Sequence, residues 1–124
     1  MKVYNKLGNG FQEKIYHRAL AMEMIKSGLQ FIPEYEIAVY YDTVEIGKRK
    51  VDFMVEKKIL VELKAIADLE KRNITQTMNY LEASKKEVGL LLNFGSTSLQ
   101  FHRFKLKESK SNQSDTNNPP INPI

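Results

Sequence analysis

The strongest pattern along the chain is a pair of apolar runs within residues 51–65 (VDFMVEKKILVELKA), separated by a charged turn at 56–58. Side chains alternate between the two faces of a strand, so Ile59, Val61 and Leu63 share one face. Leu60, Glu62 and Lys64 share the other. A nearly continuous apolar run is typical of a strand buried on both faces. The two runs therefore predict a hairpin inside a sheet.

Periodic patterns on either side of this hairpin predict the remaining elements. An apolar stripe at Phe11, Ile15, Ala19 and Met22 predicts a helix over 11–27. The other expected elements are a helical end over 1–7, strands over 31–41, 44–46, 88–94 and 98–104, and a helix over 69–84 with Asp68 as its N-cap. A hairpin followed by a helical crossover gives a mixed sheet. We expect an α/β (α+β) fold, αβββαββ, with helices flanking the sheet.

Length and composition predict one folded domain over residues 1–106. The chain has 124 residues, of which 42% are hydrophobic and 27% charged, as in ordinary globular proteins. Serine, asparagine, glutamine and three of the four prolines crowd the end of the chain. Such a segment buries too little apolar surface to become ordered, so 107–124 is expected to be a disordered tail.

Several classes of protein are excluded by what the sequence lacks. No cysteine is present, which excludes disulfides and cysteine-ligated zinc. No apolar run approaches the roughly 20 residues of a membrane span, and residues 1–10 do not resemble a signal peptide. We therefore expect a cytoplasmic protein. The net charge of +4 lies entirely in residues 1–106; it is compatible with a polyanionic partner, although many unrelated proteins are as basic.

The charged residues of the hairpin are the first candidates for chemistry. Glu62 and Lys64 lie about 7 Å apart along one face of the strand, and pairing of the hairpin would set Asp52 beside Glu62. A buried charge must be paired or must bind a metal, and two carboxylates with a lysine suit Mg²⁺-dependent phosphodiester hydrolysis. The alternative is a solvated outer face, which is the commoner explanation of an isolated Glu-x-Lys.

Further candidates lie on the two predicted helices. Glu13 and Tyr16 share a face of the first helix, one turn apart, and Gln76 and Tyr80 share a face of the second. Each has a structural alternative. An acid in the first turn of a helix is favoured by the helix dipole, which would explain Glu13. An amphipathic helix edge would explain the other pair, with Tyr80 in the core and Gln76 at its rim.

The remaining basic and histidine residues give weaker signals. The run at 48–50 either contacts phosphate or forms a solvated turn that leads into the strand of Asp52. His17 and His102 are isolated in the sequence and occur in no metal-ligand or catalytic-triad spacing, so we interpret both as structural or surface residues.

Four segments together resemble a known family. Gly10, Glu13 and Tyr16 have the spacing of the GxxExxY family, and VDFMVEKKILVELKA, QTMNYL and VGLLLNFG resemble its other blocks. This family belongs to the PD-(D/E)XK nuclease superfamily, and the resemblance covers about residues 3–104. Val51 stands in place of the proline in the superfamily's name. Only MKVYNK precedes the LGNGF block, where family members usually have most of a helix.

The resemblance implies a restriction-endonuclease-like core and a set of site residues. Asp52 corresponds to the first acid of the superfamily, and Glu62-x-Lys64 corresponds to its E-x-K. Glu13 corresponds to the acid of the first helix. Gln76-x-x-x-Tyr80 resembles the helix element of the recombination-exonuclease branch.

These correspondences imply a metal-dependent nuclease that hydrolyses phosphodiester bonds. Asp52 and Glu62, with Glu13 and the Leu63 carbonyl, would bind one or two Mg²⁺ ions, for which Mn²⁺ could substitute. Lys64 would orient the attacking water and stabilise negative charge. The supporting or substrate-contacting residues would be Gln76, Tyr80 and Tyr16.

The partner implied is nucleic acid, with DNA the expected substrate and no membrane involved. No evident motif distinguishes DNA from RNA as the substrate, and none encodes a preference for a nucleotide sequence. Substrate choice is expected to come from a possible homodimer or from a partner protein. Two alternatives stay open. One is a catalytically silent nuclease-like domain that binds nucleic acid, and the other is a small assembly or interaction domain in which the polar cluster only fixes the fold.

Overall fold

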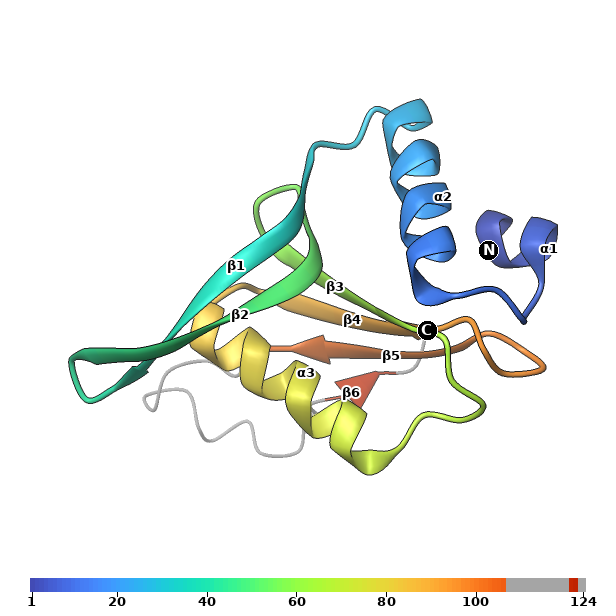
Figure 1. Ribbon diagram of the computed structural model, residues 1–124. Coiled ribbons are helices and arrows are strands. Elements are labelled where there is room, and N and C mark those ends of the chain that lie inside the picture. The colour runs from blue at the N-terminus through green and yellow to red at the C-terminus, as the bar shows by residue number, and fades with distance from the viewer. Residues whose placement is uncertain (107–120, 123–124) are drawn as a thin grey trace.

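The computed structural model describes residues 1–106 and 121–122 (Figure 1). The helices are α1 (Lys2–Leu7), α2 (Glu13–Lys26) and α3 (Lys71–Ser84). The strands are β1 (Phe31–Tyr41), β2 (Val44–Val55), β3 (Ile59–Lys64), β4 (Val88–Asn93), β5 (Gln100–Lys105) and β6 (Ile121–Asn122). Among the described residues, no helix is long and apolar enough to cross a membrane.

The strands form one sheet in the order β1-β2-β3-β4-β5-β6. Neighbouring strands are antiparallel except β3 and β4, which are parallel because α3 carries the chain back across the sheet between them. The mixed sheet and the αβββαββ order are confirmed, and α1 matches the expected helical end over 1–7. β6 lies within the segment that was expected to be disordered, and the rest of that segment, 107–120 and 123–124, lies outside the described residues.

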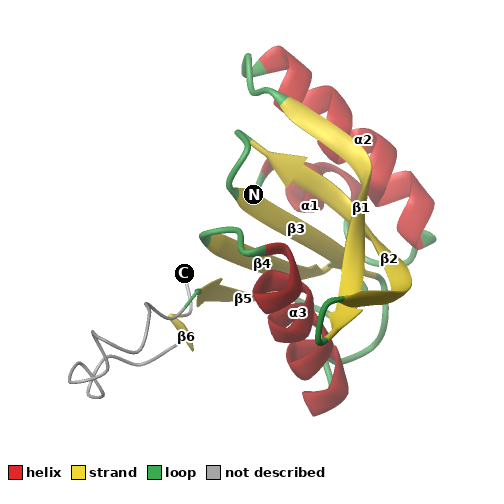
Figure 2. Ribbon diagram, turned by 90° about the vertical axis from the view of Figure 1, so that its left-hand side faces the viewer, coloured by secondary structure: helices red, strands yellow, loops and turns green. Residues whose placement is uncertain are grey.

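β3 is the centre of the molecule because both of its faces are buried. Val61 and Leu63 pack in a core with Tyr16 of α2. Leu60, on the opposite face, packs in a second core with Leu81 of α3. The predicted alternation in this strand is therefore confirmed, and α2 and α3 cover opposite faces of the sheet (Figure 2).

The predicted apolar stripe of the first helix is confirmed at Ala19, which packs against the core, but is wrong at its two ends. α2 begins at Glu13, after a loop in which Gly8 and Gly10 have positive φ. Phe11 lies before the helix and is exposed, as is Met22. The sheet instead covers the face that carries Tyr16 and Met24. The helix has apolar residues on several faces, so its own periodicity does not decide which one the sheet covers.

Two other boundaries differ from the prediction. The expected short strand over 44–46 and the basic run after it belong to one strand, because β1 supplies pairing partners along β2, including Ile37 opposite Arg49. Glu70, rather than Asp68, is the N-cap of α3, in a capping box with Asn73. The long β1–β2 hairpin projects from the body of the molecule (Figure 1).

Candidate active site

The two carboxylates lie where the regular pairing of β2 and β3 ends. Phe53 pairs with Val61, so one step further sets Asp52 opposite Glu62. The backbone N–H of Asp52 donates to Glu62 Oε1 at 3.2 Å, and the backbone N–H of Leu63 donates to Asp52 Oδ2 at 2.7 Å. Side-chain oxygens thus accept hydrogen bonds from the backbone of the facing strand, and they fix the position of one carboxylate relative to the other.

Burial gives this pair an unusual electrostatic environment. Glu62 is 8% exposed, which excludes the solvated outer face. Burial, followed by the hydrogen bond and the charge of Asp52, raises the pKa of Glu62 to about 9. Without a cation, Glu62 therefore keeps its proton near neutral pH, because its negative charge would be buried next to Asp52.

Lys64 and Glu13 lie on the borders of this pair. Lys64 is half-buried on the same face of β3 as Glu62, and its charge lowers the pKa of that acid. Glu13 is exposed at the start of α2. Partial desolvation and then the charge of Asp52 raise the pKa of Glu13, whereas the charge of Lys64 lowers it. The structure therefore brings all four predicted catalytic residues to one end of β3.

The predicted three-carboxylate metal site is not assembled in this arrangement. Among residues 1–106 and 121–122, no three acidic or histidine side chains are close enough together to hold a metal ion. The donor chemistry nevertheless fits a divalent cation. Asp52 raises the pKa of both Glu13 and Glu62, so negative charge is in excess there, and a hard cation with carboxylate ligands would neutralise it. The Leu63 carbonyl stays a predicted ligand.

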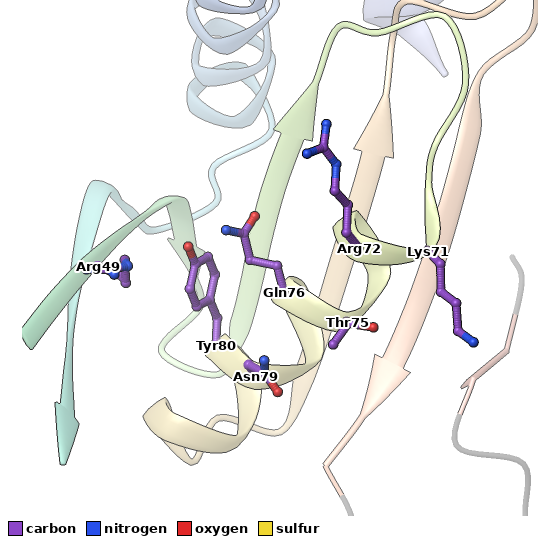
Figure 3. A pocket seen from close by; sticks show the side chains of 7 residues that line it. All are labelled: Arg49, Lys71, Arg72, Thr75, Gln76, Asn79 and Tyr80. Atoms are coloured by element: carbon purple, nitrogen blue, oxygen red, sulfur yellow. The ribbon is translucent and has the colours of Figure 1, made fainter. Parts of the chain in front are cut away.

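A groove of about 610 Å³ lies on the α3 side of the sheet (Figure 3). Glu62 and Lys64 are on the same side, since they share a face of β3 with Leu60, which packs in the core under α3. The lining residues of the groove are Arg49, Lys71, Arg72, Thr75, Gln76, Asn79 and Tyr80. Burial and then the charge of Glu62 raise the pKa of Tyr80, while the charge of Arg49 lowers it. The charge of Glu62 therefore reaches the groove at Tyr80. Gln76 and Tyr80 both face it, and Arg49 reaches it from a strand rather than from a solvated turn.

Tyr16, the last predicted site residue, is fully buried in the core on the α2 side. Its ring stacks on Phe94, with centroids 4.5 Å apart and planes at 15°. Its hydroxyl donates to the carbonyl of Gly8 and accepts the N–H of Phe11. Tyr16 thus fixes the loop that leads to Glu13 and has no surface with which to contact a substrate.

His17 was interpreted as isolated, but the structure places it against the acidic pair. Its Nε2 lies 3.2 Å from the carbonyl oxygen of Asp52, 3.9 Å from Asp52 Oδ1 and 3.8 Å from Glu34 Oε1. Its ring stacks on Phe53 with centroids 4.1 Å apart. The available signal was helical spacing, since His17 lies one turn after Glu13 on the same face of α2.

Asn93 is a second residue near the site that was not predicted from the sequence. Asn93 Oδ1 accepts the N–H groups of Ile66 and Gly95, while Asn93 Nδ2 donates to the Ile66 carbonyl and to Gln100 Oε1. Gln100 Oε1 also accepts the N–H of Leu69. These bonds fix the loop between β3, which carries the acid and the lysine, and α3, which carries the groove. The only sign in the sequence was a polar residue ending the apolar run VGLLLN.

Comparison with solved structures supports the assignment of the fold. The crystal structure of SSO0001 aligns with a TM-score of 0.59 at 15% identity, over 87% of this chain and 60% of that one. An alkaline exonuclease (LHK-Exo) from Laribacter hongkongensis aligns with a TM-score of 0.56 at 12% identity, over 83% of this chain and 60% of that one. The chain therefore spans 60% of the length of both neighbours.

Comparison at the level of sequence adds the family. No curated protein matches the chain. The model of the PD-(D/E)XK nuclease superfamily matches residues 1–104, which is nearly all of the folded part that carries the acids, the lysine and the groove. This chain belongs to the PD-(D/E)XK nuclease superfamily.

Proposed function

We propose that this chain is a divalent-metal-dependent nuclease of the GxxExxY type that hydrolyses phosphodiester bonds, with DNA the expected substrate. The observation that supports this proposal is the contact between Asp52 and buried Glu62, beside Lys64 and next to a groove with basic residues. Membership of a nuclease superfamily makes a reaction at phosphorus the natural use of such a site.

The proposed metal would be Mg²⁺, with Mn²⁺ as a substitute. When bound, it would lower the pKa of a coordinated water and neutralise negative charge at the reacting phosphate. Asp52 and Glu62 would supply its carboxylate oxygens, and both already occupy fixed positions through bonds to the facing strand. Glu13 and the Leu63 carbonyl would supply further oxygens, directly or through water.

The roles of the other residues follow from where charge and protons move. The water oxygen bonds to phosphorus, the ester P–O bond breaks, and the leaving oxygen takes up a proton. Lys64, the positive group beside the acidic pair, would orient the attacking water and stabilise the developing negative charge. Gln76 and Tyr80, in the groove, would hold the phosphate in line with that water.

A cleavage panel tests this function. Linear and circular substrates of single- and double-stranded DNA and RNA are incubated with Mg²⁺, with Mn²⁺ or with EDTA. We expect cleavage that needs a divalent metal and is lost in Glu62→Ala/Lys64→Ala. Glu56→Ala/Lys58→Ala is the matched control, because it removes the same two residue types at the same spacing from the exposed β2–β3 turn.

The outcomes separate the open alternatives. Cleavage that survives in the site variant would contradict the assignment of Glu62 and Lys64. A folded wild-type protein that binds nucleic acid without cutting it would favour the silent binding module. Calorimetry adds an independent readout, since Glu62→Gln should weaken Mg²⁺ binding by about tenfold or more, and an unchanged metal titration would contradict the ligand assignment.

A further inference from the structure

The groove beside the acidic pair is lined by one kind of chemistry. Three of its seven lining residues are cationic, namely Arg49, Lys71 and Arg72, and the other four carry neutral amide or hydroxyl groups. In the part of the chain that the structure describes, no acidic side chain lines it. Arginine, lysine, threonine, asparagine, glutamine and tyrosine are the residue types that make most protein contacts to phosphate and sugar. The lining therefore suits a polyanion that presents both phosphates and hydroxyls.

The positions of the cations indicate an extended ligand rather than a single anion. Arg49 approaches the Tyr80 end of the groove from β2, whereas Lys71 and Arg72 lie at the other end, in the first turn of α3 (Figure 3). The nine steps along the helix from Lys71 to Tyr80 correspond to about 13.5 Å. One strand of B-form DNA carries a phosphate about every 3.4 Å of its axis, so this length matches about four nucleotides.

The two ends of the groove differ in their surroundings. Tyr80 packs against the core that contains Met54 and Leu60, which lie two positions from Asp52 and Glu62 on the same face of the sheet. This end of the groove therefore lies toward the acidic pair. At the other end Arg72 is paired with Glu70 at 2.7 Å but remains exposed, and Lys71 is exposed as well. A cavity of about 610 Å³ is within the range of roughly 300–1,000 Å³ that suits compact ligands. Six of its seven lining residues are exposed, so the groove is open to solvent and a few nucleotides of one strand can lie along it.

We propose that this groove binds the sugar–phosphate backbone of the nucleic-acid strand that leads to the Asp52–Glu62–Lys64 site. Lys71 and Arg72 contact phosphates at one end, and Arg49 contacts a phosphate about four nucleotides further along the strand. The neutral residues between them contact sugar and phosphate oxygens. This assignment rests on the proposed nuclease function. It adds the path of the strand and the residues that hold it.

Binding measured without cleavage tests the path separately from the chemistry. Fluorescence anisotropy of a labelled oligonucleotide is recorded in EDTA, between about 50 and about 200 mM salt. We expect Arg49→Gln/Lys71→Gln/Arg72→Gln to weaken binding at least about tenfold, and to reduce the slope of log K against log salt by about 2, since each phosphate contact on a single strand contributes about 0.7.

The matched control is Lys26→Gln/Lys57→Gln/Lys58→Gln. It removes the same charge from exposed lysines at the opposite end of β3. There the β2–β3 turn is tied to the segment after α2 by the hydrogen bond from the N–H of Glu56 to the carbonyl of Gln30. We expect this variant to keep a slope close to that of the wild type. Equal losses of oligonucleotide affinity in the two triple variants would overturn the proposal, because they would show that binding depends on net charge alone.

Neutral linkages in the oligonucleotide locate the contacts. Replacing single phosphates by methylphosphonates should weaken binding by the wild type at a few adjacent positions, and the same replacements should have little further effect on the groove variant. Additive losses at every position would overturn the proposal. So would wild-type protein that binds no oligonucleotide, or that binds a mononucleotide as tightly as an oligomer of about four nucleotides.

These outcomes can be told apart from failure of the proposed function. If oligonucleotide binding depends on the groove but no metal supports cleavage, the path stands and the nuclease assignment fails. If cleavage depends on Glu62 and Lys64 but is unaffected in the groove variant at limiting substrate, the nuclease stands and the path fails. Comparing the affinities for single-stranded and duplex DNA and RNA then identifies which kind of nucleic acid the groove prefers.

Discussion

The carboxyl group of Glu62 lies in an environment that favours its protonated form. Its folded-state pKa is raised to about 9 by burial and by Asp52, from an ordinary value of 4.5. In the metal-free protein the folded state therefore keeps a proton that the unfolded chain releases. Stability from this group is complete below about pH 4.5 and is lost as the pH rises through about 9, with a slope of at most about 1.4 kcal/mol per pH unit.

Glu62→Gln should remove this dependence because the amide does not titrate. Urea unfolding in EDTA, between about pH 5 and about pH 9, should show a falling free energy of unfolding for the wild type and a flatter curve for the variant. Glu56→Gln, in the exposed turn, is the control and should follow the wild type. Parallel curves for all three proteins would mean that Glu62 ionises in the folded state as an exposed acid does.

His17 is expected to hold Asp52 in place. Its Nε2 is 3.2 Å from the Asp52 carbonyl, and its ring is stacked on Phe53. His17→Ala removes both contacts, so the carboxylate loses part of its support. Loss of a group that orients a ligand typically costs about 10- to 100-fold in activity. We therefore expect kcat to fall about tenfold while the dissociation constant for oligonucleotide in EDTA changes less than about twofold.

The conservative variant distinguishes positioning from general stability. His17→Gln keeps a hydrogen-bond donor near the Asp52 carbonyl, so it should recover part of the lost kcat. Arg18→Ala, one residue further along α2 and exposed, should leave kcat unchanged. If His17→Ala and His17→Gln lower kcat and melting temperature to the same degree, the histidine would be a packing residue only.

The sequence predicted residues whose neighbours are local and missed those whose partners are remote. Asp52 was predicted to lie beside Glu62 and Lys64 if the two apolar runs of 51–65 paired as a hairpin, and the strands pair in this way. His17 was missed because its contact to Asp52 joins residues 35 positions apart. Tyr16 was assigned to the site by its spacing from Glu13, but the stacking on Phe94 that places it in the core depends on tertiary packing.

At the scale of elements, the β3–α3 loop depends on one buried side chain. Asn93 makes four hydrogen bonds, to Ile66, Gly95 and Gln100, and it is fully buried. Asn93→Ala would leave buried backbone groups unpaired, each at a cost of about 1–3 kcal/mol that does not add in full. We expect the free energy of unfolding to fall by about 2–4 kcal/mol in urea titrations.

The same loop links the two parts of the site, so a milder change tests its functional role. Gln100→Leu removes the acceptor for Leu69 and Asn93 and should disturb the start of α3 while most of the fold survives. We expect weaker oligonucleotide binding together with a smaller loss of stability. Asn5→Ala, an exposed change in α1, is the control. Full stability of Asn93→Ala would contradict the structural role of this network.

Elements were predicted well where one local pattern decided them. The alternation in β3 gave both of its faces, and the apolar side of α3 was predicted correctly because Leu69, Ile74, Met78 and Leu81 occupy one core. The phase of α2 was not predictable, because its apolar residues lie on several faces. The full length of β2 was not predictable either, since it depends on partners supplied by β1.

At the scale of the whole molecule, β3 joins two cores that would otherwise be separate. Val61 and Leu63 belong to the core under α2, and Leu60 belongs to the core under α3. A strand that is central to both layers couples them, so residues 1–106 should unfold as one unit. The sequence suggested a single domain from length alone, whereas the structure supplies the physical reason why its halves should depend on each other.

Truncation of either face of β3 tests this coupling. Leu63 is 0% exposed and Leu60 is 1% exposed, so Leu63→Ala and Leu60→Ala should each lower the free energy of unfolding by about 2–5 kcal/mol. Far-UV circular dichroism and tyrosine fluorescence should give coincident urea transitions in both variants, because loss of one core removes support for the other. Leu29→Ala, at a 40% exposed position, should cost less than about 1 kcal/mol. Two separate transitions, each sensitive to only one of the core substitutions, would show instead that the layers under α2 and α3 fold independently.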